Sequence, residues 1–211
     1  MTEADRADDA AVLEFLAVMR RLRAECPWKA AQTHRSLARY LLEETHEALE
    51  ALDTDDSAHL REELGDLLLQ VFLHTAIAEE AGDFTTGDVA RGVTEKMITR
   101  NPHVFGDEPA DDLDPAAVNE LWESRKAVEK QRTSVTEGLA PGLPALLYAD
   151  KVLDRLSRAG VSTRSLRSRL DHLVESGRAD LGERLLALVA EARASGTDPE
   201  QALRDAVRRL L

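Results

Sequence analysis

Several residue types are scarce in this sequence, and each shortage excludes a class of protein. A single cysteine among 211 residues cannot form an intrachain disulfide, and it fits the reducing cytoplasm, where we expect the protein to be located. No window approaches the ~18 consecutive apolar residues of a membrane span, so we expect no membrane partner. Aromatic residues make up only 4%, and alternating β-branched runs are few. The most abundant residues include Ala, Leu, Glu and Arg, which favour helices, so the composition predicts an all-α fold.

Positive charge is also in short supply. The chain carries 27 Lys and Arg against 40 Asp and Glu, a formal net charge of −13. Nucleic-acid binders usually present a basic face, so this balance predicts no nucleic-acid partner. Free nucleotides are not excluded, because their sites need only a few well-placed cations. The acidic start of the chain is unlike a signal peptide, and we expect residues 1–10 to be a disordered tail.

Acidic residues form two clusters within residues 41–66. Glu43, Glu44 and Glu47 occupy one predicted helix, and Glu63 and Asp66 begin the next. Carboxylates three or four positions apart lie on the same side of a helix, so two packed helices would aim four or five of them at one point. Such a group repels itself unless a cation lies between, and its oxygens suit Mg²⁺ or Mn²⁺. The alternative is a solvated acidic face, which is common in an acidic chain.

The second of these predicted helices, residues 60–80, is apolar nearly all round. Its large hydrophobic side chains are Leu67, Leu68, Leu69, Val71, Phe72, Leu73 and Ile77. This pattern predicts a helix buried on every side, where carboxylates are costly unless they are paired or metal-bound. Two antiparallel helices cannot bury such a helix, whereas a four-helix bundle built from two chains can. We therefore predict a homo-oligomer, most economically a homodimer. Gly65 indicates close approach by a ligand or a neighbouring helix, or a plain packing requirement.

Two other classes of protein compete with a Mg²⁺ enzyme. Glu43-x-x-His46 is half of a di-iron carboxylate signature, which needs Glu-x-x-His on two helices. No other Glu has His three residues later, which argues against a di-iron bundle. The second competitor is a non-catalytic helical protein that senses nucleotides or acts as a scaffold, and the five acids weigh against it.

Cations and tryptophans offer candidate ligand contacts. Lys96 and Arg100, at i and i+4, suit a triphosphate, although such a pair also suits a solvated face. Trp122 and Lys126 have the same spacing and could offer a ring and a cation, or cap the bundle. Trp28, in a Cys-Pro-Trp loop, could stack on a nucleobase or cover a core. The residues by themselves leave these alternatives open.

Together these motifs resemble one protein family. EETHE at 43–47 followed by ELGD at 63–66 is similar to the EExxE…ExxD signature of MazG-type nucleoside triphosphate pyrophosphohydrolases. Three further segments resemble that family in order and spacing, namely CPWKAAQTHRSL at 26–37, KMITRNPHVFGD at 96–107 and LWESRK at 121–126. The chain departs from the family at Lys29, where Asp is usual, and at Asn101, where His is usual. We predict that residues 11–132 form the MazG-like catalytic domain.

The resemblance implies a helical bundle completed by homodimerisation, and it implies hydrolysis of an NTP or dNTP to the monophosphate and pyrophosphate. It further implies Mg²⁺ held by four carboxylates, those of Glu44, Glu47, Glu63 and Asp66. Glu43 is then the candidate base for the attacking water. The remaining roles would be charge compensation by Lys96, Arg100 and Lys126, and base recognition by Trp28 and Trp122. House-cleaning of the nucleotide pool, broad or for one base, is the expected role.

The last third of the chain resembles a second, decayed copy. Residues 133–144 contain clustered Pro and Gly and predict a linker. Beyond it, the segment from Asp180 to Val189 echoes the segment from Glu63 to Phe72, while LRSRLDHL at 166–173 has arginines where the EExxE motif would lie. No carboxylate metal site can form there as in the first half. We predict that residues 145–211 are a degenerate MazG-like helical region that supports assembly.

Overall fold

The computed structural model describes residues 2–106 and 114–210, and over these residues the secondary structure is helical, without strands. The chain divides into two compact units, Met1–Arg125 and Lys126–Leu211. The division lies inside one helix, α7 (Pro115–Lys130), and therefore a few residues before the predicted linker. Residues 133–144 lie in the turns between α7 and α8, as a linker requires. No helix in the described part of the chain is long and apolar enough to cross a membrane.

The first unit begins with α1 (Glu3–Glu25) and the short α2 (Pro27–Ala30). The expectation of a disordered tail over residues 1–10 is not met, because α1 already begins at Glu3. Its first turns contain Glu, Ala, Asp and Arg but no Gly or Pro, so nothing interrupts helix formation ahead of the apolar positions. Pro27 then starts α2 at a position where a missing N–H costs nothing.

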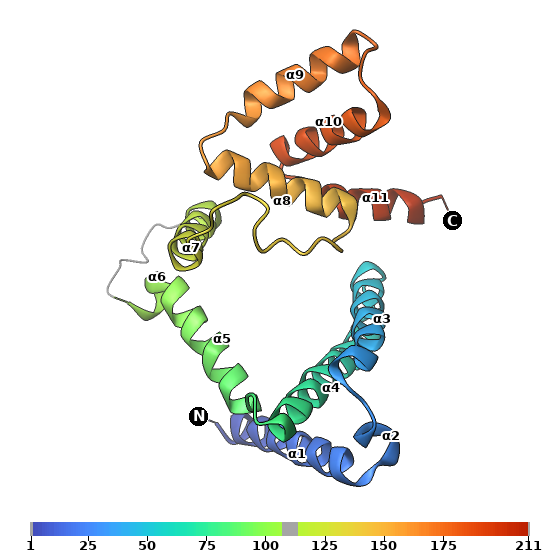
Figure 1. Cartoon of the computed structure of the whole chain (residues 1–211), viewed down its shortest axis with the longest axis vertical. Helices are drawn as coiled ribbons and strands as arrows, with labels where there is room; N and C mark the ends of the chain where they lie inside the picture. The colour runs from blue at the N-terminus through green and yellow to red at the C-terminus, as the bar shows by residue number, and fades with distance from the viewer. Residues whose placement is uncertain (1, 107–113, 211) are drawn as a thin grey trace. The chain divides into compact units, whose positions relative to one another are not determined.

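The next two helices, α3 (His34–Asp53) and α4 (Ser57–Ala81), form a hairpin and lie side by side in Figure 1. A capping box starts α3, in which Thr33 Oγ1 accepts from the Ser36 amide at 3.1 Å and Ser36 Oγ accepts from the Thr33 amide at 2.9 Å. Asp56 starts α4 by accepting hydrogen bonds from two backbone amides. The two helices are joined by only a short turn, so they pack antiparallel and their facing residues are fixed in register.

The core of this unit forms where α1 crosses the hairpin. Met19, Leu37, Phe72 and Leu73 are buried there, and the ring of Phe15 lies 5.4 Å from that of Phe72. Arg23 secures the crossing, since it donates to the carboxylate of Glu80 on α4 and to backbone carbonyls between α2 and α3. The core therefore holds α3 and α4 together at the end of the hairpin that is distant from its turn.

One face of α4 remains uncovered within the chain. Leu64, Leu68 and Val71 are 54%, 38% and 43% exposed, at i, i+4 and i+7. The sequence predicts that α4 is buried on every side in a bundle of two chains, and this stays a prediction, because the exposed stripe is the face that a second chain would have to cover. Within one chain, α1 and α3 cover only part of the helix circumference.

Two helices and a short turn of helix complete the described part of the first unit. They are α5 (Thr86–Arg100), α6 (Pro102–Phe105) and most of α7. The Thr86 hydroxyl lies 2.7 Å from that of Thr75, which fixes the start of α5 against α4. From this shared end α5 runs away from the hairpin (Figure 1). The acidic, proline-flanked segment from Asp107 to Pro115 lies largely outside the described residues.

The second unit contains four helices, α8 (Ala145–Arg158), α9 (Thr163–Glu175), α10 (Leu181–Ala194) and α11 (Pro199–Arg208). Ser162, Asp180 and Asp198 cap the starts of the last three through side-chain oxygens. Leu153, Leu170 and Val189 are buried between them. All four helices lie within residues 145–211, for which the sequence predicts a helical region.

Candidate metal centre

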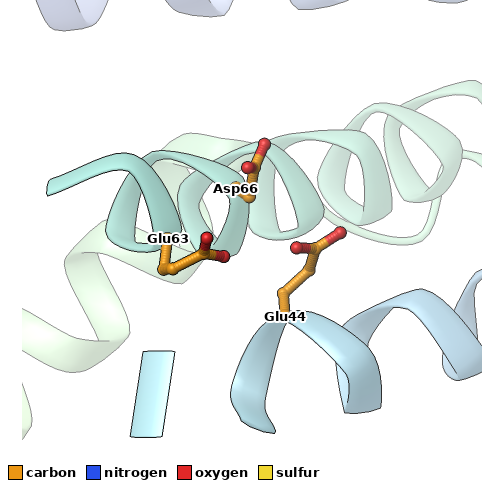
Figure 2. A group of neighbouring side chains, drawn as sticks. All are labelled: Glu44, Glu63 and Asp66. Carbon is orange, nitrogen blue, oxygen red and sulfur yellow. The ribbon is translucent and has the colours of Figure 1, made fainter. Parts of the chain in front are cut away.

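Three of the five predicted acids meet between the two helices of the hairpin. Glu44 projects from α3, while Glu63 and Asp66 project from α4 toward it (Figure 2). One oxygen from each carboxylate lies within 4.8 Å of the other two. The spacing of Glu63 and Asp66 places them on one face of α4, and the short turn sets Glu44 opposite.

This closeness is visible in the ionisation of Glu44. Its pKa is raised above the usual glutamate value, chiefly by burial and then by the negative charge of Asp66, with Glu47 and Glu63 adding to the effect. Glu44 therefore ionises less readily than an ordinary glutamate in the protein alone. A cation between these oxygens would remove the repulsion that raises this pKa.

Glu63 is the most deeply placed of the three and has one oxygen without a partner. Its Oε1 lies 3.0 Å from Nε2 of His59, one turn earlier on α4. Its Oε2 is buried and accepts no hydrogen bond from any described residue. A buried carboxylate oxygen without a donor is costly, and a metal ion would satisfy it.

The residues present therefore fit a hard divalent cation. Glu44, Glu63 and Asp66 offer only oxygen atoms, which Mg²⁺ and Mn²⁺ prefer, and Mg²⁺ binds through few carboxylates while keeping several waters. The alternative of a di-iron centre has no support in this geometry. His46, the histidine of the half-signature, is exposed on α3 and is not part of the group.

The other two predicted acids lie at the margin. Glu47 is exposed, but it is close enough to raise the pKa of Glu44. Glu43 is exposed and does not belong to the group. The two packed helices thus place three carboxylates within 4.8 Å of one another, with Glu47 beside Glu44 at the margin of the group.

An aromatic pair lies close to the carboxylates along α3. Tyr40 precedes Glu44 by one turn, and its ring meets the edge of the Trp28 ring at 6.0 Å. Trp28 itself is 50% exposed, so much of its ring is available to a ligand. Arg39 donates to the hydroxyl of Tyr40 at 3.0 Å and its guanidinium lies over the same ring. Trp28 thus contacts Tyr40, which packs against the core, while half of its own surface faces solvent.

The cationic side chains predicted to bind phosphate lie on other helices than the carboxylates. Lys96 is exposed on α5, whereas Arg100 is only 6% exposed and lies 5.2 Å from the centre of the Trp122 ring. Both residues belong to the second half of α5, the helix that runs away from the hairpin (Figure 1). Lys126 belongs to the second compact unit.

Comparison with known proteins agrees with this geometry. Residues 32–105 match the profile of the MazG nucleotide pyrophosphohydrolase domain. The chain is 36% identical over 214 residues to the "Nucleoside triphosphate pyrophosphohydrolase/pyrophosphatase MazG" of Thermotoga maritima, covering 94% of this chain and 82% of that protein. The chain belongs to the MazG family. The matched residues include the three carboxylates of the metal centre, whereas Trp28, Trp122 and Lys126 lie outside the match.

A second curated relative supports the same family. The "Nucleoside triphosphate pyrophosphohydrolase" of Escherichia coli (strain K12) is 34% identical over 215 residues, with 91% of this chain and 81% of that protein covered. A crystal structure of a mazG-related protein from Thermotoga maritima is 28% identical, with a TM-score of 0.46 over 56% of this chain and 97% of the other.

Three residues near the MazG-type carboxylates escaped the sequence reasoning. His59 was detectable, because it precedes Glu63 by four positions and so shares its helix face. Gln70, four residues after Asp66, is 4% exposed and its Oε1 is buried without a partner. Its polar character within an apolar run was the available signal. Tyr40 gave none, since its proximity to Trp28 depends on how α2 folds back on α3.

Proposed function

We propose that this chain is a Mg²⁺-dependent nucleoside triphosphate pyrophosphohydrolase that converts NTPs or dNTPs to the monophosphate and pyrophosphate. The observation that carries this proposal is the group of Glu44, Glu63 and Asp66 within the MazG-matched residues 32–105. The buried, partnerless oxygen of Glu63 supports a cation at that point. The names of the Thermotoga and Escherichia relatives support the reaction and the substrate class.

Each acid has a distinct role in this proposal. Glu44, Glu63 and Asp66 would supply oxygen ligands to the metal ion. Glu47, which is exposed beside Glu44, would be the fourth ligand. A bound Mg²⁺ or Mn²⁺ would neutralise phosphate charge and activate water. Glu43, one residue away from Glu44 and exposed to solvent, would take the proton of the attacking water. No covalent nucleophile is needed.

The remaining candidates would position the nucleotide. Trp28 is half exposed beside Tyr40 and one turn from Glu44, which suits stacking on a base near the carboxylates. We assign Lys96, Arg100 and Lys126 to charge compensation. We keep Trp122 as a second base contact, although its ring is covered in part by the guanidinium of Arg100.

We further propose that two copies of the chain form a homodimer through α4. Leu64, Leu68 and Val71 form an uncovered apolar stripe, and burying each such side chain fully is worth roughly 1.5–3 kcal/mol. A second helical hairpin on this stripe would complete a four-helix bundle around the acids. A single cysteine fits the cytoplasm, where house-cleaning of the nucleotide pool is the role that we propose.

The reaction is tested by incubating the full chain with a panel of NTPs and dNTPs and Mg²⁺, while pyrophosphate and orthophosphate are measured separately. We expect monophosphate plus pyrophosphate, lost in EDTA and in Asp66→Asn. Glu62→Gln is the matched control, because Glu62 is an exposed acid on α4 outside the carboxylate group. Orthophosphate release would disprove the proposed cleavage position. Binding without turnover would favour the nucleotide sensor or scaffold.

Assembly is tested separately by light scattering at several protein concentrations. We expect the wild-type mass to be that of a dimer and Leu68→Glu to shift it toward the monomer. Leu188→Glu is the control, because Leu188 is 60% exposed and lies in the second unit. A monomeric wild type, or equal effects of the two substitutions, would contradict the proposed interface.

A further inference from the structure

The second compact unit contains a pocket with an unusual lining. Its volume is about 380 Å³, and it lies among α8, α9 and α10. Arg164 and Arg167 of α9 and Arg193 of α10 line it, and no acidic residue does. Leu153 and Ala190 provide an apolar wall. Three guanidinium groups around one small pocket suit an anion with several charges, since each can donate two parallel hydrogen bonds to phosphate oxygens.

Carboxylates of α8 hold one of these arginines in place. Arg193 donates to Asp150 at 3.1 Å and also to Asp154. Burial opposes ionisation of Asp154, but hydrogen bonds from Arg158 and Arg193 lower its pKa below the usual value, so it remains a carboxylate. The guanidinium of Arg193 is thereby oriented by groups outside the pocket lining. An oriented arginine loses little side-chain entropy when a ligand binds.

The other two arginines carry most of the uncompensated charge. Arg167 has Asp171 at 3.7 Å, a long contact between side chains that are each about half exposed. Arg164 is exposed and forms no ion pair with any residue in the described ranges. Thr163 also lines the pocket and is the first residue of α9, so the positive end of the helix dipole adds to the charge.

This pocket is not a second copy of the metal centre. The DLGE segment that echoes the first-unit acids begins at Asp180 and lies at the start of α10, whereas Ala190 and Arg193 lie near the end of that helix. The charge of the surroundings also differs. Residues 126–211 carry slightly more Lys and Arg than Asp and Glu, although the whole chain has 27 against 40. A local basic pocket in an acidic protein attracts small anions selectively.

We propose that the pocket of Arg164, Arg167 and Arg193 is a binding site for a polyphosphate anion, either free pyrophosphate or the diphosphate of a nucleotide, and that it binds this ligand without a metal. The pocket volume is within the range of small-molecule sites, and the wall of Leu153 and Ala190 offers apolar contact to a sugar or base. This site is independent of the carboxylates of the first unit and of the reaction proposed for them.

The test measures binding of inorganic pyrophosphate and of ADP to the full chain by calorimetry in EDTA, so that no metal ion is available to the carboxylates. We expect Arg164→Gln/Arg167→Gln to weaken binding by about tenfold or more, as expected for lost charged hydrogen bonds. The matched control is Arg169→Gln/Arg178→Gln, which removes the same charge from exposed residues of the same unit outside the pocket. Circular dichroism confirms that both variants are folded, and Arg164→Glu alone serves as an independent variant.

The outcomes separate the alternatives. Weaker binding of pyrophosphate or ADP by the pocket variants, with little change in the control variant, establishes the site. Tighter binding of ADP than of pyrophosphate by the wild type identifies a nucleotide as the ligand. Equal loss in the pocket and control variants would mean general attraction to a basic surface and would overturn the proposal. Undetectable binding by the wild type, or binding unchanged by substitution of Arg164 and Arg167, would overturn it as well.

Discussion

His59 lies one helical turn before Glu63 on α4, with its Nε2 3.0 Å from Oε1 of the carboxylate. This contact occupies one oxygen of Glu63 and leaves the other, Oε2, buried and without a partner. A carboxylate that is held on one side and open on the other has a fixed orientation toward the carboxylates of Glu44 and Asp66. We therefore expect His59 to act as a positioning residue for the candidate metal centre.

Substitution of His59 should weaken metal binding. Groups that orient metal ligands typically contribute about 10–100-fold to metal affinity or activity, so we expect His59→Ala to lower Mn²⁺ affinity by roughly tenfold. His59→Gln, which retains a hydrogen-bond donor, should restore part of the loss. Mn²⁺ titration by calorimetry measures the effect directly, with His46→Ala as the control because His46 is exposed on α3. Unchanged Mn²⁺ affinity in His59→Ala would show that Glu63 needs no such support.

Glu44 should destabilise the metal-free protein at neutral pH. The pKa of Glu44 is raised in the folded state, so the folded protein binds the proton of this carboxyl group more tightly than the unfolded chain does. Stability therefore falls as pH rises from the ordinary glutamate pKa through the raised one, and it stays lower above that. We expect Glu44→Gln to have a higher Tm than wild type in EDTA at pH 7, with the difference disappearing in acid.

Mg²⁺ should reverse that order. The wild type gains stability from a ligand that binds only the folded state, whereas Glu44→Gln loses a ligand and gains less. Thermal unfolding of both proteins from acid to neutral pH, with EDTA and with Mg²⁺, measures both effects. A Glu44→Gln variant that is less stable than wild type in EDTA at pH 7 would be inconsistent with repulsion among the carboxylates.

Arg23 should be important for stability although it lies away from the metal centre. It is 9% exposed and donates to Glu80 of α4 and to the carbonyls of Lys29 and Gln32, which joins α1, α2 and the hairpin. Arg23→Ala removes the hydrogen bonds to Glu80 and to both carbonyls, of which that of Lys29 still accepts from the Gln32 amide, and we expect a loss of about 2–3 kcal/mol in the free energy of unfolding.

The control for Arg23 is its near neighbour Arg21. Arg21→Ala removes only an exposed i,i+4 pair with Glu25, so its expected cost is below about 0.5 kcal/mol. Urea unfolding of both variants gives the comparison. Equal losses would mean that the hydrogen bonds of Arg23 do not hold the crossing of α1 and α4.

Substitution of Gly65 shows whether a second chain covers the acidic end of α4. A Cβ at this position would meet nothing within 4 Å, so the suggested close approach is absent from the single chain. If no partner covers this face, Gly65→Ala should stabilise the helix by about 1 kcal/mol. Gly82→Ala is the opposite case, because Gly82 ends α4 at φ +75 and an alanine there should cost about 1–2 kcal/mol.

Chemical unfolding of the two glycine variants, combined with light scattering, distinguishes two outcomes for Gly65. A stabilised protein of unchanged mass would place the face of Gly65 in solvent. A destabilised protein with a reduced mass would place that face in the homodimer contact, which would explain the glycine by packing against a second chain.

The sequence was most informative where local chemistry decides the structure. Thr33, Asp56, Asp180 and Asp198 each begin a helix as their side-chain oxygens predict, and Gly82 ends one. The EExxE and ELGD motifs correctly indicated that acids of two helices would meet, since register within a helix is fixed by its period. The expected tail is instead part of α1, because Glu and Ala at residues 3–10 favour helix formation without apolar positions.

The sequence by itself determined most of the helices, their capped starts and the acidic faces of α3 and α4, because each of these depends on residues a few positions apart. Only the tertiary structure decided that Glu44, Glu63 and Asp66 meet while Glu43 stays outside, and that Tyr40 lies beside Trp28. It also decided that Arg164 and Arg193 line one pocket. These outcomes depend on how helices cross and which faces they bury, and crossing is set by the packing of side chains distant in sequence.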